Sequence, residues 1–145
     1  MALEFNGTTQ YIDCGNESSL QIVSDVSVSA WLMVEENWVP ADHNYHNIAV
    51  KGSIFNLGYG LVVYEKSGIS GATYPQFFMR SVSGSADSGL SFSVPTNWGK
   101  NNWVHLLGTF NNTENRLRLY ESGKIKVEVS TEYNPGATTD HFYLA

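Results

Sequence analysis

The sequence predicts an all-β domain built as a two-layer antiparallel sandwich. Apolar and polar residues alternate with period 2 in short segments, and no long segment shows the 3.6-residue period of a helix. Clusters of Gly, Asn, Ser and Pro separate these segments. About ten such segments in 145 residues are typical of a sandwich or barrel. We therefore expect one domain over residues 1–145, with no linker or internal repeat.

The expected strands follow the alternating segments in chain order. An opening hairpin turns at Asn6 and Gly7, and a Ser122–Gly123 turn joins the last long hairpin. The expected strands are Leu3–Phe5, Tyr11–Cys14, Val26–Val34, Ile48–Val50, Tyr59–Tyr64, Gln76–Val82, Leu90–Val94, Trp103–Phe110, Arg116–Glu121, Lys124–Val129 and Phe142–Ala145.

The alternation also assigns the two faces of each strand. The even positions of Val26–Val34 are all apolar and point inward, which places Trp31 and Met33 outside. The same rule in Trp103–Phe110 places His105 outside. One sheet is therefore expected to carry an aromatic, partly polar outer face made of Trp31, Tyr64, Phe78, Arg80 and His105. Such a face suits a sugar ring, which stacks its C–H face on aromatics and hydrogen-bonds through its hydroxyls. The alternative is that loops cover this face and make it a second core layer.

Composition narrows the function classes. The net charge is −6 and the basic residues are scattered, so the concentrated positive patch that nucleic acid requires is absent from the sequence. Cys14 is the single cysteine, which excludes an intrachain disulfide, and we expect it to be small and buried. No apolar run reaches membrane-spanning length and no signal peptide is visible. The domain would be extracellular or cell-surface if it belongs to a longer precursor.

The polar–aromatic segment 36–47 is expected to form a binding rim at one end of the sandwich. Trp38 and Tyr45 are its candidate contacts, and Tyr74 and Trp98 are candidates to join it from other loops. Its histidines, with the H-x-x-H spacing of residues 43–46, are a weak transition-metal signal because no third and fourth ligand lie nearby.

Catalysis is not expected. Glycoside hydrolysis needs two carboxylates across the scissile bond, which on a sheet face means acidic residues at i, i+2 or i+4. No strand carries that pattern: Glu35 and Glu36 are adjacent, and Glu121 and Glu128 are on opposite arms of a hairpin. No G-x-S-x-G motif is present either.

Several segments together resemble one known family. ALEFNGTTQYIDCGN, VSVSAWLMV, IAVKG, YGLVV, NWVHLLGTF and RLYESGK, in this order, resemble the laminin-G-like domains of the concanavalin A-like lectin/glucanase superfamily. The resemblance runs from Ala2 to Ala145. It implies a jelly-roll sandwich with one concave sheet and with ligands held on that face or at its rim. It also implies that calcium is a candidate cofactor at the rim, although neither Asn6 nor Asp13 matches a ligand motif closely.

The sequence departs from the family pattern in two further places. The turn aspartate of L-Y-x-D-G is missing, since the chain reads Leu119-Tyr-Glu-Ser-Gly. Family members continue with two more strands after the one matching Phe142–Ala145, so we expect a shortened fold. A sandwich without those strands exposes an edge, which favours homo-oligomers.

The sequence thus predicts a non-catalytic, lectin-like module that binds carbohydrate. Two alternatives stay open, namely a protein-interaction or adhesion module without a sugar site, and a fragment of a glycosidase-like enzyme. His105 lies in the W-x-H pattern of the shared frame, so a structural role is favoured for it over a role in lining the ligand site.

Overall fold

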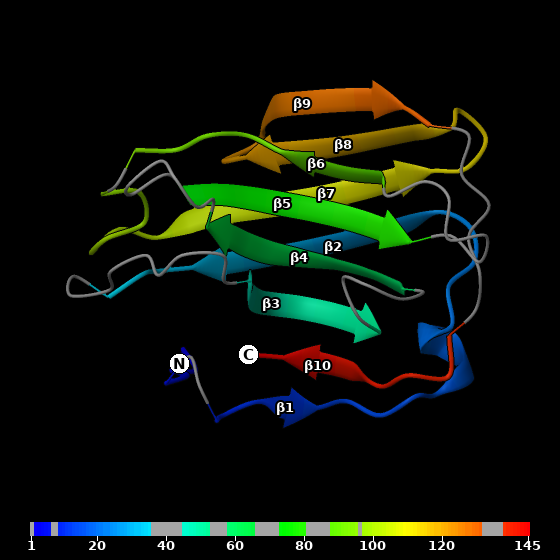
Figure 1. Cartoon of the computed structure of the whole chain (residues 1–145), viewed down its shortest axis with the longest axis horizontal. Helices are drawn as coiled ribbons and strands as arrows, with labels where there is room; N and C mark the ends of the chain where they lie inside the picture. The colour runs from blue at the N-terminus through cyan, green and yellow to red at the C-terminus, as the bar shows by residue number, and fades with distance from the viewer. Residues whose placement is uncertain are drawn as a thin grey trace.

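The protein is an antiparallel sandwich of two sheets (Figure 1). The computed structural model describes residues 2–6, 9–35, 45–52, 58–65, 73–80, 88–95, 97–131 and 138–145. Within them the only helix is a single 3₁₀ turn, η1 (Ser18–Leu20). No helix in this part of the chain has the length and apolarity needed to cross a membrane.

The larger sheet has six strands and the smaller one has four. In spatial order, the larger sheet contains β1 (Ile12–Asp13), β10 (Phe142–Leu144), β3 (Tyr45–Gly52), β4 (Gly58–Glu65), β5 (Thr73–Arg80) and β6 (Ser88–Ser91). The smaller sheet contains β2 (Val26–Leu32), β7 (Val104–Asn111), β8 (Arg116–Glu121) and β9 (Lys124–Ser130). The predicted all-β sandwich class is confirmed.

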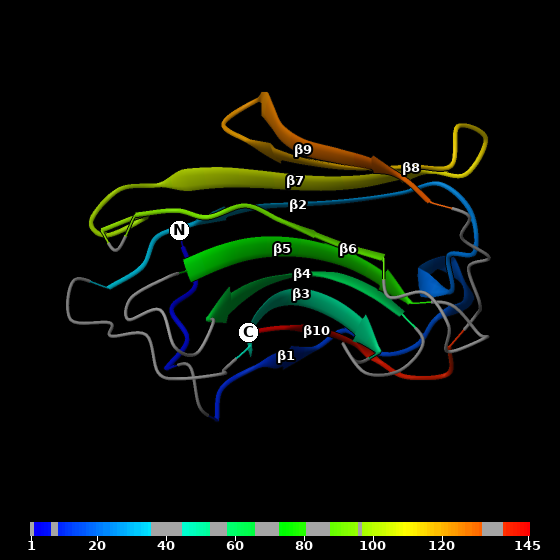
Figure 2. The same cartoon turned by 45° about the horizontal axis from the view of Figure 1, so that its top comes forward.

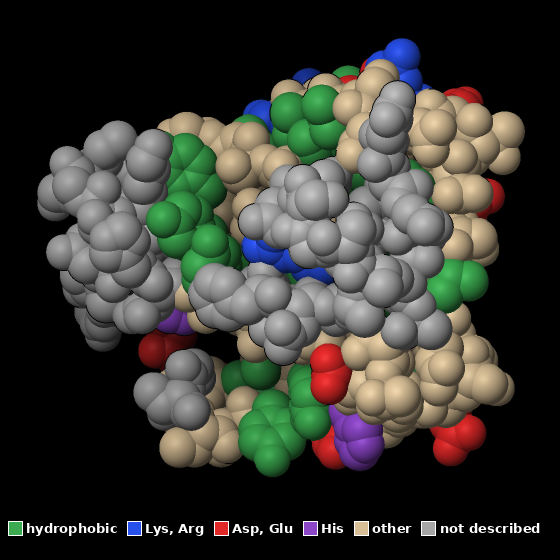
Figure 3. All heavy atoms as spheres, turned by 45° about the vertical axis from the view of Figure 1, so that its right-hand side comes forward, with side chains coloured by type: hydrophobic (Ala, Val, Ile, Leu, Met, Phe, Trp, Pro, Cys, Tyr) green, Lys and Arg blue, Asp and Glu red, His purple; other side chains and the backbone are tan. Residues whose placement is uncertain are grey.

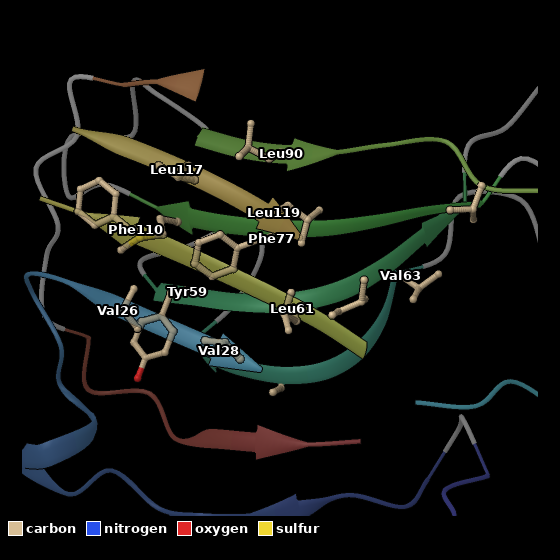
Figure 4. Close-up of a cluster of buried hydrophobic side chains, with 14 of the residues drawn as sticks. Val26, Val28, Tyr59, Leu61, Val63, Phe77, Leu90, Phe110, Leu117 and Leu119 are labelled. Atoms are coloured by element: carbon tan, nitrogen blue, oxygen red, sulfur yellow. The ribbon is translucent and has the colours of Figure 1, made fainter. Parts of the chain in front are cut away.

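The core lies between the two sheets, as Figure 4 shows. In β2 the even residues face inward, so Val26 and Val28 are buried while Trp31 is 65% exposed. The alternation in β7 likewise buries Leu106 and Phe110. The inward and outward assignments made for these two strands are confirmed, because a period-2 pattern fixes the face of a strand once its backbone is extended.

The two layers approach each other closely at Gly108 of β7. A Cβ placed on Gly108 would lie 2.2 Å from Cγ and Cδ2 of Phe77, on β5 in the other sheet. Phe77 is fully buried and fills the space that a larger residue at 108 would need. This contact fixes how the sheets stack.

The predicted opening hairpin is wrong. Residues 2–6 form no strand, and β1 pairs antiparallel with β10, Ile12 opposite Leu144 and Asp13 opposite Tyr143. The Asn6 side chain instead accepts hydrogen bonds from the backbone N–H groups of Thr9 and Gln10 at 2.9 and 3.1 Å. Such local bonds compete with strand pairing.

The prediction that Cys14 is buried is also wrong. Its side chain is exposed, although its backbone N–H donates to the Phe142 carbonyl at 2.8 Å. The residue follows β1 at the edge of the larger sheet, where one side of the strand has no neighbour in the strand order. Edge position exposes side chains that residue type alone would place inside.

Candidate functional site

The outer face of the larger sheet is a curved surface that faces away from the smaller sheet. Figure 2 shows β3, β4 and β5 bending so that their concave side points outward. The strand register places five residues in one row across this concave face, from β10 to β6: Tyr143, Val50, Gly60, Phe78 and Gly89.

The predicted ligand-binding residues do not share one sheet, so that expectation is wrong. Tyr45, Tyr64, Phe78 and Arg80 belong to the concave face of the larger sheet, whereas Trp31 and His105 lie opposite each other on the smaller sheet. Alternation sets which face of its strand a residue occupies, but it does not say which sheet the strand joins. Trp38 lies outside the described residues.

Three tyrosines form a row at one end of the concave face. Tyr45, Tyr64 and Tyr74 are directly opposite one another on β3, β4 and β5. The rings of Tyr45 and Tyr64 stack with centroids 4.5 Å apart, and those of Tyr64 and Tyr74 are 6.4 Å apart. Burial and the neighbouring Tyr64 raise the pKa of Tyr45, while Arg80 acts in the opposite direction. The phenol of Tyr45 is therefore neutral at neutral pH.

The middle of the concave face is apolar and covered. Phe78 is 2% exposed and packs with Val50 and Val62, and Tyr45 packs against the same small cluster. For these residues the structure confirms the alternative expectation: they are buried and form a second core layer. The Phe78 ring packs in this layer, so it is not a direct ligand contact in this conformation.

A further group of polar and aromatic residues was not predicted from the sequence. We call it the edge patch; it consists of Tyr11, Asp13, His141 and Tyr143 on β1, β10 and their flanks. Tyr11 is 62% exposed, and its ring meets that of Tyr143 edge-on at 5.5 Å. The rings of His141 and Tyr143 stack with centroids 6.1 Å apart.

Figure 3 shows hydrophobic, histidine and acidic side chains beside one another in its lower part, over β1 and β10. The signal for the edge patch was present in the sequence, as Y-x-D at residues 11–13 and H-x-Y at residues 141–143. Each pattern puts two side chains on the same face of a strand. Only the pairing of β1 with β10 brings the two patterns together.

Hydrogen bonds to the Asp13 carboxylate connect the polar residues of the edge patch. Nδ1 of His141 lies 2.8 Å from both carboxylate oxygens of Asp13, and the backbone N–H of Gly15 donates to the same carboxylate at 2.8 Å. The hydrogen bond from His141 lowers the pKa of Asp13, and the bond from Gly15 lowers it further. Desolvation raises the pKa of Tyr143, and the Asp13 charge adds to that effect. The patch thus holds the ionised carboxylate of Asp13 beside the neutral phenol of Tyr143.

Trp31 and His105 form a separate pair on the smaller sheet. Their ring centroids are 5.1 Å apart, and Nε2 of His105 is 2.8 Å from the hydroxyl of Ser29. The His105 carbonyl also accepts from the backbone N–H of Ser122 at 2.8 Å. The His105 side chain thus contacts Ser29 and Trp31 of β2, and its main-chain carbonyl contacts the β8–β9 turn. The structural role of His105 stays a prediction.

The structure places the other candidate rim residues in different environments. Tyr74 joins the tyrosine row, as described above. Trp98 is 9% exposed and donates through Nε1 to the Glu121 carboxylate at 2.5 Å, so it is part of the frame. His46 lies within β3 and faces the sandwich interior, opposite Val63. Residues 36–44 lie outside the described part of the chain.

The described residues hold no group of three or more His, Cys, Asp and Glu side chains that converges on one point. The two positions considered for calcium are engaged elsewhere, Asn6 with Thr9 and Gln10, and Asp13 with His141. Their oxygens therefore do not fit a cation site that needs six or more oxygen ligands. Calcium remains a prediction from the resemblance alone.

Comparison with known proteins gave one family match. A family model described as the concanavalin A-like lectin/glucanases superfamily matches residues 6–145. A search of curated proteins returned no match.

Among solved structures, the fold resembles "Ruminococcus gnavus IT-sialidase CBM40 bound to alpha2,3 sialyllactose". The TM-score is 0.64 at 12% identity, over 95% of this chain and 72% of that one. It also resembles the botulinum neurotoxin serotype D binding domain, with a TM-score of 0.58 at 18% identity over 92% of this chain. The binding domain of botulinum neurotoxin DC in complex with SialylT matches at a TM-score of 0.58 and 18% identity, over 83% of this chain. The chain spans 31% and 27% of those two toxin domains.

Proposed function

The chain belongs to the concanavalin A-like lectin/glucanase superfamily, and from this premise we propose that it is a non-catalytic carbohydrate-binding module. The proposed site is the concave face of the larger sheet. Its proposed contacts surround the covered middle of that face. They are Tyr45 and Tyr64 at one end of the strands, Arg80 at the other end, and the edge-patch residues Tyr11, Asp13, His141 and Tyr143 at the sheet edge.

The observation that carries the proposal is the edge patch. Tyr11 offers an exposed aromatic ring next to the ring of Tyr143, a surface on which the C–H face of a sugar stacks. Asp13 and His141 supply an acceptor and a ring nitrogen within the same patch. Aromatic surface and polar groups at one point are what recognition of a hydroxyl-rich ring requires.

The spacing on the sheet favours an oligosaccharide over a single sugar. β10 and β4 are separated by β3, and Tyr64 lies four residues along β4 from Gly60, which is in the row of Tyr143. With strands about 4.8 Å apart and a rise of about 3.3 Å per residue, Tyr143 and Tyr64 are on the order of 15 Å apart. One ligand that contacts both must therefore contain several linked rings.

The relatives support a glycan ligand. The structures named above include a CBM40 domain bound to sialyllactose and a toxin domain in complex with SialylT. A sialylated oligosaccharide is therefore the first class to test, and Arg80 on the concave face is the candidate partner for its carboxylate.

The test is a glycan array with and without calcium, followed by titration of the best ligand. We expect Tyr11→Ala and Tyr143→Ala each to weaken binding tenfold or more, because each removes a stacking surface. Trp31→Ala is the matched control, since Trp31 is exposed to the same degree but lies on the smaller sheet. No binding to any glycan would leave the protein-interaction reading in its place, and turnover of a polysaccharide would refute the non-catalytic part.

A further inference from the structure

The contact between His141 and Asp13 determines which chemical groups the edge patch can recognise. Nδ1 of His141 lies 2.8 Å from both carboxylate oxygens of Asp13. Nε2, on the other side of the ring, has no hydrogen-bond partner within the described residues. We propose, as an extension that rests on the proposed function, that the edge patch is specific for an uncharged sugar ring with two neighbouring hydroxyl groups, which donate to Nε2 of His141 and to the Asp13 carboxylate.

Asp13 fixes which nitrogen of the neutral imidazole carries the proton. The hydrogen bonds from His141 and from the Gly15 backbone hold the pKa of this carboxyl below 3.8, so at neutral pH it is ionised and can only accept. The nitrogen that faces it, Nδ1, must therefore donate, which leaves Nε2 with its lone pair. His141 consequently presents an acceptor to a ligand, and not a donor.

Asp13 offers a second acceptor beside the first. The backbone N–H of Gly15 donates to Oδ1 at 2.8 Å, and the single Nδ1–H of His141 is shared between the two oxygens. A carboxylate has about four lone-pair sites, so these two donors do not use all of them. The side chains of His141 and Asp13 are 48% and 42% exposed, so a ligand can reach both.

Two neighbouring hydroxyls of a sugar ring match this pair of acceptors. The acceptors lie on opposite sides of one imidazole ring, so a molecule that reaches both must carry two donors close together. Hydroxyls on adjacent carbons are such a pair, since each O–H can donate. The Tyr143 ring, with its centroid 6.1 Å from that of His141, lies beside them and offers a stacking surface to the C–H face of the same sugar.

The charge of the edge patch selects an uncharged ring. None of its four residues is a lysine or arginine. Desolvation raises the pKa of the Tyr143 phenol, and the charges of Asp13 and Asp140 raise it further, so both carboxylates act on this surface. A carboxylate or sulfate on the bound ring would face the same two charges, and like charges at close range weaken a complex.

This selection gives the concave face a direction. Arg80 lies on β5, which β3 and β4 separate from the β10 strand of the edge patch. An acidic oligosaccharide would therefore place an uncharged ring on the edge patch and its anionic ring toward Arg80. The reverse orientation would bring the ligand's negative charge against Asp13.

The first experiment measures the protonation of His141 in the free protein. Nitrogen NMR of the imidazole at mildly alkaline pH, where the ring is neutral, should find the proton on Nδ1. Asp13→Asn should remove this preference, because an amide can donate as well as accept. The internal control is His105 on the smaller sheet, whose Nε2 lies 2.8 Å from the Ser29 hydroxyl and whose signals should not change. A proton on Nε2 of His141 in the parent chain would overturn the proposal.

The second experiment titrates the protein with the methyl glycosides of glucose, galactose and mannose, followed by the NMR signals of His141 and Tyr143. In the tightest-binding glycoside each hydroxyl is then replaced in turn by fluorine, which cannot donate. We expect about tenfold weaker binding for substitution at two neighbouring positions, because a site built around a hydroxyl rejects the analogue that lacks it. His141→Phe keeps an aromatic ring beside Tyr143 without the nitrogens, and should weaken binding of the unmodified glycoside to a similar degree.

Methyl glucuronide tests the charge selection. At low salt it should bind more weakly than methyl glucoside, and Asp13→Asn should reduce the difference. Equal binding of all fluorinated analogues, or tighter binding of the glucuronide, would overturn the proposal. So would the absence of any response at His141 and Tyr143 to the three glycosides. A positive glycan array would then still support the proposed function with the ligand held elsewhere on the concave face, whereas an empty array would refute both.

Discussion

The ammonium group of Lys51 donates a hydrogen bond to the side-chain oxygen of Asn16, although Lys51 is completely buried. Lys51 lies on β3 and faces the sandwich interior, opposite Tyr59 and Phe142. It also donates to the main-chain carbonyl of Asp140. Asn16 in turn donates through Nδ2 to the Thr139 carbonyl at 2.8 Å. A single buried cation thus ties β3 to the segment after β1 and to the segment before β10.

The first prediction concerns stability. Lys51→Met should lower the free energy of unfolding by about 2 kcal/mol, because the buried acceptors on Asn16 and Asp140 lose their donor. Urea denaturation measures the loss. Lys124→Met, at an exposed position of the β9 hairpin, is the control and should change stability by less than about 0.5 kcal/mol. Stability equal to that of the parent chain would show that the ammonium does not hold these segments.

The second prediction follows from the titration of the same group. Burial lowers the pKa of Lys51 below its ordinary value of 10.5, and the Asp140 carboxylate opposes this only in part. Between the lowered pKa and 10.5 the unfolded chain binds more protons than the folded one. The contribution of Lys51 to stability therefore increases as pH rises through this window and is constant above it.

The measurement is the difference in unfolding free energy between the parent chain and Lys51→Met at several pH values. The raised pKa values of Tyr45, Tyr59 and Tyr143 make the stability of the fold decrease as pH rises. Both chains share this contribution, so it cancels in the difference. We expect the difference to grow in favour of the parent chain as pH rises toward 10.5. A constant difference would contradict the lowered pKa.

The third prediction concerns the edge patch. The carboxyl of Asp13 should titrate below its ordinary value of 3.8, and His141→Ala should raise that pKa because it removes the strongest hydrogen bond to the carboxylate. Carbon-detected NMR of the side chain measures it. The stabilisation supplied by Asp13 is present above pH 3.8 and is lost as the pH falls through the lowered pKa. His105→Gln, on the other sheet, should leave the Asp13 pKa unchanged.

Trp31, Lys51 and the edge patch show what a single sequence can and cannot predict. The faces of β2 and β7 followed from alternation, so Trp31 was correctly placed outside. The burial of Lys51 was unpredictable, because charge assigns lysine to the surface unless its partners are known. Asn16 and Asp140, those partners, are 35 and 89 residues away. The edge patch was missed for the same reason, since long-range pairing brings it together.

The fourth prediction concerns the contact between the two layers. Gly108→Ala should destabilise the fold by about 1–3 kcal/mol or more, because its Cβ would overlap the buried Phe77 ring. Thermal or urea unfolding measures the loss. The double variant Gly108→Ala with Phe77→Leu should recover part of it by removing ring atoms at the contact. If the second change only adds to the loss, the overlap is not the cause.

The pairing of β1 with β10 has a consequence for how the binding face comes into being. Asp13 and His141, which are in contact, are separated by 128 residues in the chain. Contacts of such high sequence separation form slowly, because a long loop must close before they gain any stabilisation. On a growing polypeptide the edge patch cannot exist until nearly all of the described strands have been synthesised. Recognition by this face is therefore a late event of folding, and a partly folded chain would be invisible to a ligand that depends on it.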